Sequence, residues 1–195
     1  MLEKLIQILF PETNYERIVS NIEYLTPEVS TGEIVTCCDY RNKEVKAAIS
    51  LLKRGVKSNS DRLLSTLLYD VLLEEVSEYD FWDRKQVVII PMPISSKRRK
   101  ERGFNQMERI CELLPSPLKE CVDVNILKQV KSVVMQKRLS RKERIENVKG
   151  IFEVSGDLKG KTVILVDDVL TTGATMNEAI ETLGDNVKAF ALARA

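Results

Sequence analysis

The chain has 195 residues, of which 44% are hydrophobic and 30% are charged, and its net charge at pH 7 is +1. This length is sufficient for one substantial core and too short for two comfortable domains, and the composition is ordinary for a soluble globular protein. No apolar run approaches the roughly 18 residues that a membrane helix needs, and no signal peptide is recognisable at the N-terminus. We therefore expect a cytoplasmic protein without membrane insertion.

The absence of histidine limits the chemistry that the chain can perform. It excludes Ser-His-Asp and Cys-His catalysis, HExxH zinc sites and any acid–base step through an imidazole. The four cysteines show neither CxxC spacing nor a disulfide framework, which agrees with a reducing compartment. Chemistry must therefore use carboxylates, Lys or Arg, Tyr, hydroxyl groups, a metal or the substrate itself.

The near-zero net charge hides two basic segments. Residues 95–109 carry six basic and two acidic side chains, and residues 128–149 carry eight basic and two acidic side chains. The rest of the chain is acidic. This asymmetry indicates an anionic ligand.

The first 35 residues predict a small helical extension without chemistry. Apolar residues at helical spacing indicate short helices over 2–9 and 15–22. We assign residues 1–35 to this N-terminal extension and residues 36–195 to the main domain.

The next part of the chain predicts a strand over 34–40 and two helices. The first helix covers 42–54 and stops at Gly55, and the second is capped by Asp61 and continues past Leu72. Both are expected to pack on a sheet. Lys53 has a plausible ligand role, although its position alone predicts a solvated lysine.

Residues 86–91 (QVVIIP) predict a second, fully buried strand, followed by a basic loop and a helix to about Leu114. Ligands of open parallel sheets bind outside the carboxyl ends of the strands, so this loop is expected to face a ligand crevice. Its candidate residues are Ser95, Ser96, Lys97, Arg98 and Arg102. The alternative is that the charge run is only a solvated face.

Residues 121–127 alternate as in a half-buried strand, and the second basic segment follows with helical character around 140–148. Contact with nucleic-acid phosphates is one interpretation of this segment. However, no aromatic residue lies between Lys128 and Gly150, so base stacking there is poorly supported.

The most informative stretch is residues 161–183. Residues 163–166 (VILV) predict a buried strand, Asp167 and Asp168 stand where it should end, and a helix follows; a last strand is expected over 187–193. Between the acids and the helix lie the small and hydroxyl-bearing residues Thr171, Thr172, Gly173, Ala174 and Thr175. A strand, a tight turn and a helix N-terminus together form an anion site, because free N–H groups and the helix dipole point at the ligand.

The two aspartates narrow the ligand further. They would repel a phosphate unless they serve sugar hydroxyls or Mg²⁺, so the implied ligand is a phosphorylated sugar, with or without a metal. The chain contains neither GxxxxGK[ST] nor GxGxxG. The alternative is that Asp168 ends a strand and Thr175 caps a helix, with no ligand.

All thirteen positions of residues 163–175 fit the motif that binds phosphoribosyl diphosphate (PRPP) in type I phosphoribosyltransferases. The segment PMPISSKRRKERGFNQ further resembles the P-x-P…R-x-R-G-F-N-Q signature of the ComF family of competence-associated, phosphoribosyltransferase-like proteins. Other matches to that family are Tyr40, Lys53, Gln136, Leu139, Arg144, Asn147 and Phe152. Many ComF proteins begin with a four-cysteine zinc ribbon, and this chain has no cysteine before Cys37, which puts a zinc site in doubt.

The resemblance implies an α/β type I phosphoribosyltransferase fold, with a central, mostly parallel sheet flanked by helices. It implies that Asp167 and Asp168 hold the ribose hydroxyls, that residues 171–175 hold the 5′-phosphate, and that residues 95–102 form the pyrophosphate loop with Mg²⁺. A mobile hood that closes over the site would carry Arg141, Lys142, Arg144 and Asn147.

Two functions agree with the resemblance. One is transfer of the phosphoribosyl group of PRPP to an acceptor, with release of pyrophosphate. The other is a non-catalytic accessory protein of DNA uptake that senses PRPP or binds single-stranded DNA or proteins of the competence machinery. The sequence names neither an acceptor nor a general base.

Overall fold

A parallel four-stranded sheet forms the centre of the computed structural model, which describes residues 13–56, 58–75, 86–131 and 141–195. The strand order is β1-β6-β5-β2, and every neighbouring pair is parallel. The strands are β1 (Ile34–Thr36), β6 (Val187–Arg194), β5 (Thr162–Leu170) and β2 (Val87–Pro91). The expected parallel sheet with flanking helices is confirmed.

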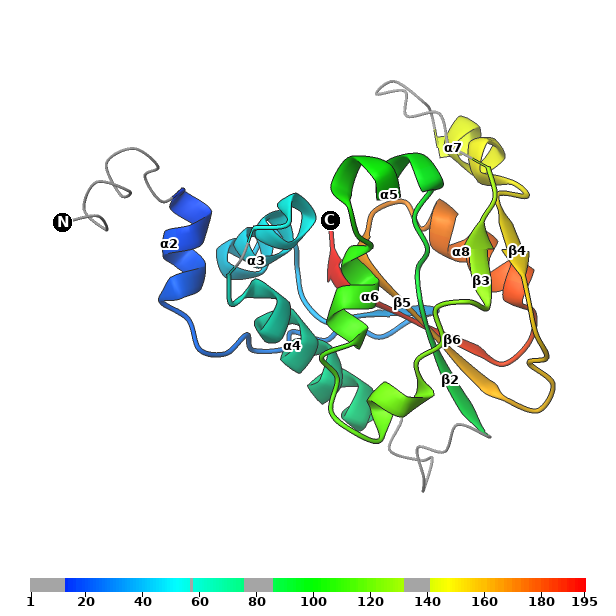
Figure 1. The fold of residues 1–195 in the computed structure, drawn as a ribbon, viewed down its shortest axis with the longest axis horizontal. Coiled ribbons are helices and arrows are strands. Elements are labelled where there is room, and N and C mark those ends of the chain that lie inside the picture. Colours follow the sequence, from blue (N-terminus) through cyan, green and yellow to red (C-terminus); the bar gives the residue numbers. More distant parts are fainter. Residues whose placement is uncertain (1–12, 57, 76–85, 132–140) are drawn as a thin grey trace.

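Each face of the sheet is covered by its own set of helices or strands (Figure 1), which pack on it through an apolar cluster. Ile164 and Val166 of β5 pack in a cluster with α3, α4 and α6, whereas Val163 and Leu165 pack in a second cluster with α8, β3 and β4. The covering elements are α3 (Lys43–Arg54), α4 (Ser60–Glu75), α6 (Gln106–Cys111), α8 (Ala174–Leu183), β3 (Leu127–Gln129) and β4 (Phe152–Val154). Burial on both faces explains why residues 87–91 of β2 and 163–166 of β5 are continuously apolar rather than alternating.

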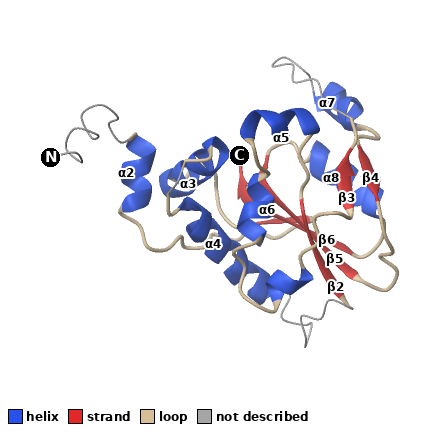
Figure 2. Cartoon of the chain, viewed as in Figure 1, coloured by secondary structure: helices blue, strands red, loops and turns tan. Residues whose placement is uncertain are grey.

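The strands β3 and β4 form a separate antiparallel pair beside the main sheet (Figure 2). The helices α5 (Ser96–Arg102) and α7 (Arg141–Val148) lie toward the top of Figure 1, and α5 begins shortly after β2 ends. The carboxyl ends of the central strands are therefore flanked by basic helical segments.

Local capping sets the ends of α3. The side chain of Asn42 accepts hydrogen bonds from the backbone N–H groups of Glu44 and Val45, and Gly55 ends the helix at a φ of 67°. Glycine adopts this left-handed conformation without the strain that a side chain adds. The predicted helix over 42–54 is confirmed, whereas α4 begins at Ser60, so Asp61 lies in its first turn and is not its cap.

Three predicted elements differ from the structure. Residues 121–127 do not form a strand: the 3₁₀ helix η1 (Leu118–Cys121) is followed by a turn in which the side chain of Asp123 accepts from the N–H of Asn125 at 2.9 Å. This local bond competes with strand pairing, and a single bridge joins Val122 to Ile89. The strand β1 ends at Thr36, and α6 ends at Cys111, both earlier than expected.

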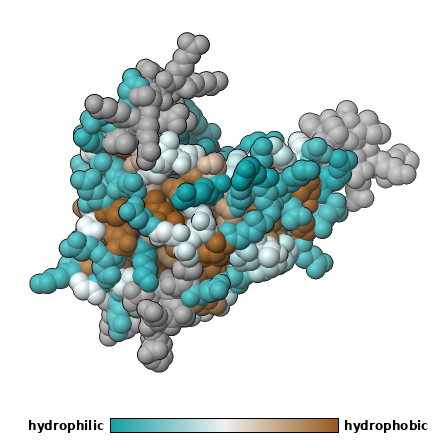
Figure 3. Space-filling model, turned by 180° about the vertical axis from the view of Figure 1, so that it is seen from behind, coloured by the Kyte–Doolittle hydropathy of each residue, from teal (hydrophilic) through white to brown (hydrophobic). Residues whose placement is uncertain are grey.

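The described part of the N-terminal region contains α2 (Asn14–Ser20), which Thr13 caps, and Val19 and Leu25 join the core. The helix expected over 2–9 lies outside the described residues, and the division of the chain at residue 35 stays a prediction. Hydrophobic residues gather in the middle of the face in Figure 3, with hydrophilic residues around them. None of the helices in the described ranges is both long and apolar enough to span a bilayer.

Candidate functional site

The acidic pair, Asp167 and Asp168, lies in the part of β5 beyond the end of the neighbouring strand β2. Pro91, the last residue of β2, pairs with Val166, whereas pairing with β6 continues from Asp167 opposite Ala191 to Leu170. The expectation that the strand ends at Val166 is therefore wrong, because β6 continues to pair with the polar residues. The two acids nevertheless lie at the carboxyl edge, where ligands of parallel sheets bind.

Asp168 faces the helices α3 and α6 and is nearly buried. One carboxylate oxygen, Oδ1, lies 3.0 Å from Nζ of Lys53, and the other, Oδ2, accepts a hydrogen bond of 2.7 Å from Nε2 of Gln106. The side chain of Asp168 is only 8% exposed, so these two partners compensate a charge that burial would otherwise disfavour. The prediction that Lys53 is a solvated lysine is wrong, because it is an ion-pair partner in this site.

Gln106 connects the acidic pair to the basic helix. It is 5% exposed, and its Oε1 accepts a hydrogen bond of 2.9 Å from Nη1 of Arg102 on α5. The neighbouring Asn105 caps α6 and donates from Nδ2 to the carbonyl oxygen of Met92, just past β2, at 3.0 Å. Sequence reasoning missed Gln106, and the only signal for it was its place in the RGFNQ segment.

Asp167 is half-buried, and its Oδ1 accepts a hydrogen bond of 2.8 Å from the N–H of Asp168. Burial first, and then the negative charge of Asp168, raise the pKa of Asp167 to about 7, against the opposing effects of the hydrogen bond, Lys53 and Arg98. The pair therefore carries less than two full negative charges near neutral pH. This reduces the repulsion that a phosphate-bearing ligand would meet.

The turn after β5 leaves a helix N-terminus accessible. Gly173 is the N-cap of α8, with a φ of 77° and no side-chain cap, and the hydroxyl of Thr172 accepts from the N–H of Ala174 at a long 3.5 Å. Thr171, Thr172 and Thr175 are exposed. The alternative that Thr175 is the cap is wrong, because the helix begins one residue before it. The first turn of α8 therefore has no side-chain cap from Gly173 and has exposed hydroxyls beside it, which are features that favour an anion.

Several residues of the basic loop, residues 95–102, are held by contacts within the protein. The hydroxyl of Ser95, which is 7% exposed, caps α5 by accepting from the N–H of Arg98, and Arg98 and Arg102 are half-buried. Ser96 and Lys97 are exposed. Arg99 forms an ion pair with Glu108 of α6, its Nη1 lying 3.0 Å from Oε1. Some of the charge run therefore fastens α5 to α6, while Lys97 remains exposed to a ligand.

The structure describes only part of the segment predicted to form the hood. Arg141, Lys142, Arg144 and Asn147 lie on α7, which confirms the helix expected near 140–148. Asn147 is half-buried, and the side chains of the other three lie outside the described set. Val148 packs in the apolar cluster that contains α8, so α7 lies against α8. Gln136 and Leu139, which matched the ComF pattern, also lie outside the described residues.

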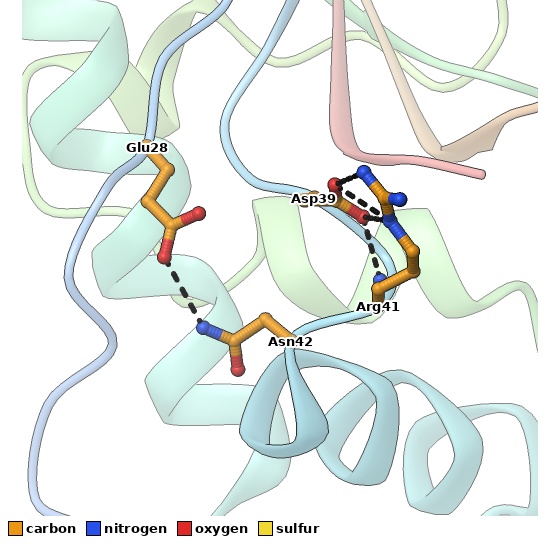
Figure 4. Close-up of polar contacts among 4 residues, drawn as sticks. All are labelled: Glu28, Asp39, Arg41 and Asn42. Carbon is orange, nitrogen blue, oxygen red and sulfur yellow. Dashed lines mark hydrogen bonds and ion pairs between the residues drawn. The ribbon is translucent and has the colours of Figure 1, made fainter.

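A pocket that the sequence did not predict opens beyond the ends of β1 and β6. It has a volume of about 520 Å³ and is lined by Glu28, Thr36, Cys38, Asp39, Arg41 and Arg194, among others. Figure 4 shows that Arg41 folds back on Asp39, with Nη2 2.6 Å from Oδ2, and that Asn42 donates to Glu28 at 3.4 Å. The hydrogen bond from the side chain of Arg41 lowers the pKa of Asp39. The residues come from separate segments, which is why no local pattern revealed the pocket.

The acidic pair offers Mg²⁺ an incomplete set of ligands. The described residues form no group of three or more His, Cys, Asp or Glu side chains that could hold a metal ion. Mg²⁺ commonly binds through one or two carboxylates together with the phosphates of a substrate, and a carboxylate such as Asp167 close to a helix N-terminus fits that arrangement.

Comparison with known proteins agrees with this architecture. Residues 72–189 match the family described as the phosphoribosyl transferase domain. Competence protein F of Haemophilus influenzae is 34% identical over 146 residues, which cover 69% of this chain and 61% of that protein. DNA utilization protein YhgH of Escherichia coli K12 is 30% identical over 152 residues (77% and 65%), and competence protein ComFC of Bacillus subtilis is 35% identical over 107 residues (54% and 41%).

The parallel sheet with two aspartates and a helix start at its carboxyl edge, together with the family match, identifies a phosphoribosyltransferase-like protein. The chain belongs to the phosphoribosyl transferase domain family. Its relatives named as competence proteins confirm the resemblance to the ComF family. The match with competence protein F spans about three fifths of that protein's length.

Proposed function

We propose that this protein binds PRPP at the carboxyl edge of its sheet and transfers the phosphoribosyl group to an acceptor. The observation that carries the proposal is the sequence of groups along one strand and turn: Asp167 and Asp168, then exposed threonines, then the Gly173-capped start of α8. Carboxylates accept hydrogen bonds from sugar hydroxyls, and a helix N-terminus favours a phosphate. PRPP carries both groups on one ribose.

Each part of PRPP has a counterpart in this arrangement. The 5′-phosphate would occupy the turn of residues 171–175, and the ribose hydroxyls would face the acidic pair. The pyrophosphate would lie against the loop after β2, where Ser96, Lys97, Arg98 and Arg102 provide donors and positive charge. The hood residues Arg141, Lys142, Arg144 and Asn147 would close over the ligand and exclude water.

The proposed reaction is a displacement at the anomeric carbon. A bond forms between the acceptor and this carbon, the bond to the pyrophosphate oxygen breaks, and its electron pair leaves with the pyrophosphate. Positive charge that develops on the ribose is stabilised by Asp167 and Asp168, and negative charge on the leaving group is stabilised by the basic loop. Mg²⁺ bound to the phosphates would neutralise further charge on the leaving group.

The names of the relatives favour a second candidate function. They are called competence and DNA utilization proteins, and α5 carries the exposed cations Lys97 and Lys100. A protein that binds PRPP or single-stranded DNA without turnover, as an accessory in DNA uptake, would use the same surface. Its binding of DNA would depend strongly on salt.

Calorimetric titration of PRPP with Mg²⁺ tests the proposal. We expect saturable binding by the wild type and a loss of at least about tenfold in affinity for Asp167→Asn/Asp168→Asn. The matched control is Asp157→Asn/Asp185→Asn, which removes the same charge from two exposed carboxylates outside the candidate site and should leave the affinity unchanged.

Turnover separates the two functions. Release of pyrophosphate in the presence of candidate acceptors, lost in the Asp167→Asn/Asp168→Asn variant, would establish the transferase. Salt-sensitive binding of single-stranded DNA without turnover, lost when the cations of residues 97–102 are neutralised, would establish the accessory function. A folded wild type that does not bind PRPP would contradict both the transferase and the PRPP-sensing interpretation.

A further inference from the structure

Four side chains from four elements form a continuous network of hydrogen bonds and an ion pair behind the proposed ribose site. Arg102 of α5 donates to Gln106 of α6, Gln106 donates to Asp168 of β5, and Asp168 is paired with Lys53 of α3. The three contacts are 2.9, 2.7 and 3.0 Å long. Gln106 and Asp168 are 5% and 6% exposed, so the middle of the network is shielded from water.

The chemistry of an amide fixes how the side chain of Gln106 is oriented in this network. The oxygen of Gln106 can only accept and its nitrogen can only donate, so the oxygen must face the guanidinium and the nitrogen must face the carboxylate. Rotating the amide by half a turn would place oxygen against carboxylate and N–H against guanidinium, and both contacts would be repulsive. Arg102 therefore fixes the amide of Gln106, which in turn fixes Asp168.

The contacts also leave Asp168 able to serve a ligand. A carboxylate has about four lone-pair positions, and two of them are used by Lys53 and Gln106. Because both oxygens are held, the plane of the carboxylate cannot turn. The remaining lone pairs keep a fixed direction, which is what recognition of a ribose hydroxyl needs.

We propose that Gln106 is a positioning residue that orients Asp168 for the ribose hydroxyls of the ligand. The inference rests on the proposed function. It makes a specific claim about which part of the ligand depends most on Gln106: ligands that carry the ribose lose more affinity than inorganic pyrophosphate, which has no hydroxyls for Asp168. A residue that only held the basic loop in place would affect pyrophosphate instead.

The experiment is a double-mutant cycle measured by calorimetry with Mg²⁺. The proteins are the wild type, Gln106→Met, Asp168→Asn and the double variant, and the ligands are PRPP, ribose 5-phosphate and inorganic pyrophosphate. We expect Gln106→Met to weaken PRPP and ribose 5-phosphate about tenfold each, because a buried carboxylate loses one fixed donor. Pyrophosphate should lose less affinity, because for that ligand only the acceptor of Arg102 is lost. In the Asp168→Asn background, Gln106→Met should add less than about twofold.

Two further variants guard the interpretation. Gln106→Glu keeps the size of the side chain and its contact with Arg102, but when ionised it cannot donate to Asp168, so above neutral pH it should weaken the ribose ligands at least as much. It keeps the test valid where Gln106→Met does not fold. Gln86→Met makes the same chemical change on an exposed glutamine at the opposite end of β2 and should change nothing.

The outcomes separate the inference from the proposed function. Equal losses for all three ligands, or additive losses in the cycle, would overturn the positioning role while leaving PRPP binding established. Unchanged affinity in both Gln106 variants would overturn it as well. A wild type that binds neither PRPP nor ribose 5-phosphate would overturn the proposed function and this inference together.

Discussion

Asp167 differs from Asp168 although the two are neighbours on one strand. Among the described residues, Asp168 has Lys53 and Gln106 as partners, whereas Asp167 accepts a hydrogen bond from the backbone N–H of Asp168 and lies beside the charge of that residue. Burial and that charge raise the pKa of Asp167 to about 7. In the unfolded chain the same group has a pKa of about 3.9, so folding moves it upward.

This direction sets the dependence of stability on pH. Well below pH 4, Asp167 is protonated in both the folded and the unfolded state, so its raised pKa does not lower the free energy of unfolding. As the pH rises from about 4 to about 7, Asp167 ionises more readily in the unfolded state than in the folded state. The free energy of unfolding therefore falls over this range. The ligand-free protein is therefore destabilised at pH 8 by one of its own proposed ligand-binding residues.

We predict that Asp167→Asn stabilises the ligand-free protein at pH 8 by about 1–3 kcal/mol and that this gain shrinks toward zero near pH 4. The amide oxygen of asparagine can still accept from the N–H of Asp168, so the local hydrogen bond is kept. Urea unfolding at several pH values measures the effect. Asp185→Asn, at an exposed position, is the control, and a destabilised or pH-independent Asp167→Asn would contradict the raised pKa.

At the scale of the elements, the loop between α5 and α6 is fastened to α3 and α4. A Cβ placed on Gly55 would lie 2.8 Å from Cε1 of Phe104, so the ring covers the glycine closely. The guanidinium of Arg109 also lies over the Phe104 ring, 4.5 Å from its centre, and forms an ion pair with Asp61. The same loop leads into Gln106, so this packing supports the proposed site.

We predict that Gly55→Ala destabilises the protein by about 2–4 kcal/mol, through the left-handed backbone and the clash with Phe104 together. Gly160→Ala is a matched control, because Gly160 has a similar φ of 73° and nothing within 4 Å of its added Cβ. It should cost only about 1 kcal/mol. Equal losses of stability in urea unfolding would show that the contact with Phe104 has no effect.

The strands and helices that carry strong local signals were predictable from the sequence. Residues 163–166, 86–91 and 187–193 are wholly or mostly apolar, and each stretch lies within a strand or within one residue of its ends. The acidic end of β5 was not predictable, because its pairing depends on β6 and not on its own hydrophobicity. The turn at Asp123 was missed because alternation of apolar residues does not report a side chain that bonds its own backbone.

The contacts of the site were less predictable than its members. The acidic pair and the TTGAT turn were found from one contiguous motif, but the partners of Asp168 come from positions 53 and 106. Local spacing carries no information about contacts over such separations. The position of Lys53 at the end of a helix predicted a solvated side chain, and only the packing of α3 against the sheet brings it to Asp168.

On the scale of the whole molecule, the sheet joins two apolar layers, and the proposed ligand would touch elements from both. Asp168, Lys53 and Gln106 belong to the side of α3 and α6, while the phosphate turn leads into α8 on the other side. A ligand that spans the carboxyl edge therefore binds only when both layers are assembled on the sheet. Its binding energy should appear as stability of the whole domain.

We predict that PRPP with Mg²⁺ raises the thermal unfolding temperature of the entire domain in one transition. At a free ligand concentration about 100 times the Kd, the stabilisation is about 2.7 kcal/mol, which corresponds to about 5–10 °C for a chain of this size. Scanning calorimetry measures the shift, and Asp167→Asn/Asp168→Asn should show little of it. A shift confined to part of the transition would mean that the ligand engages one layer alone, because a ligand that bridges both must stabilise both.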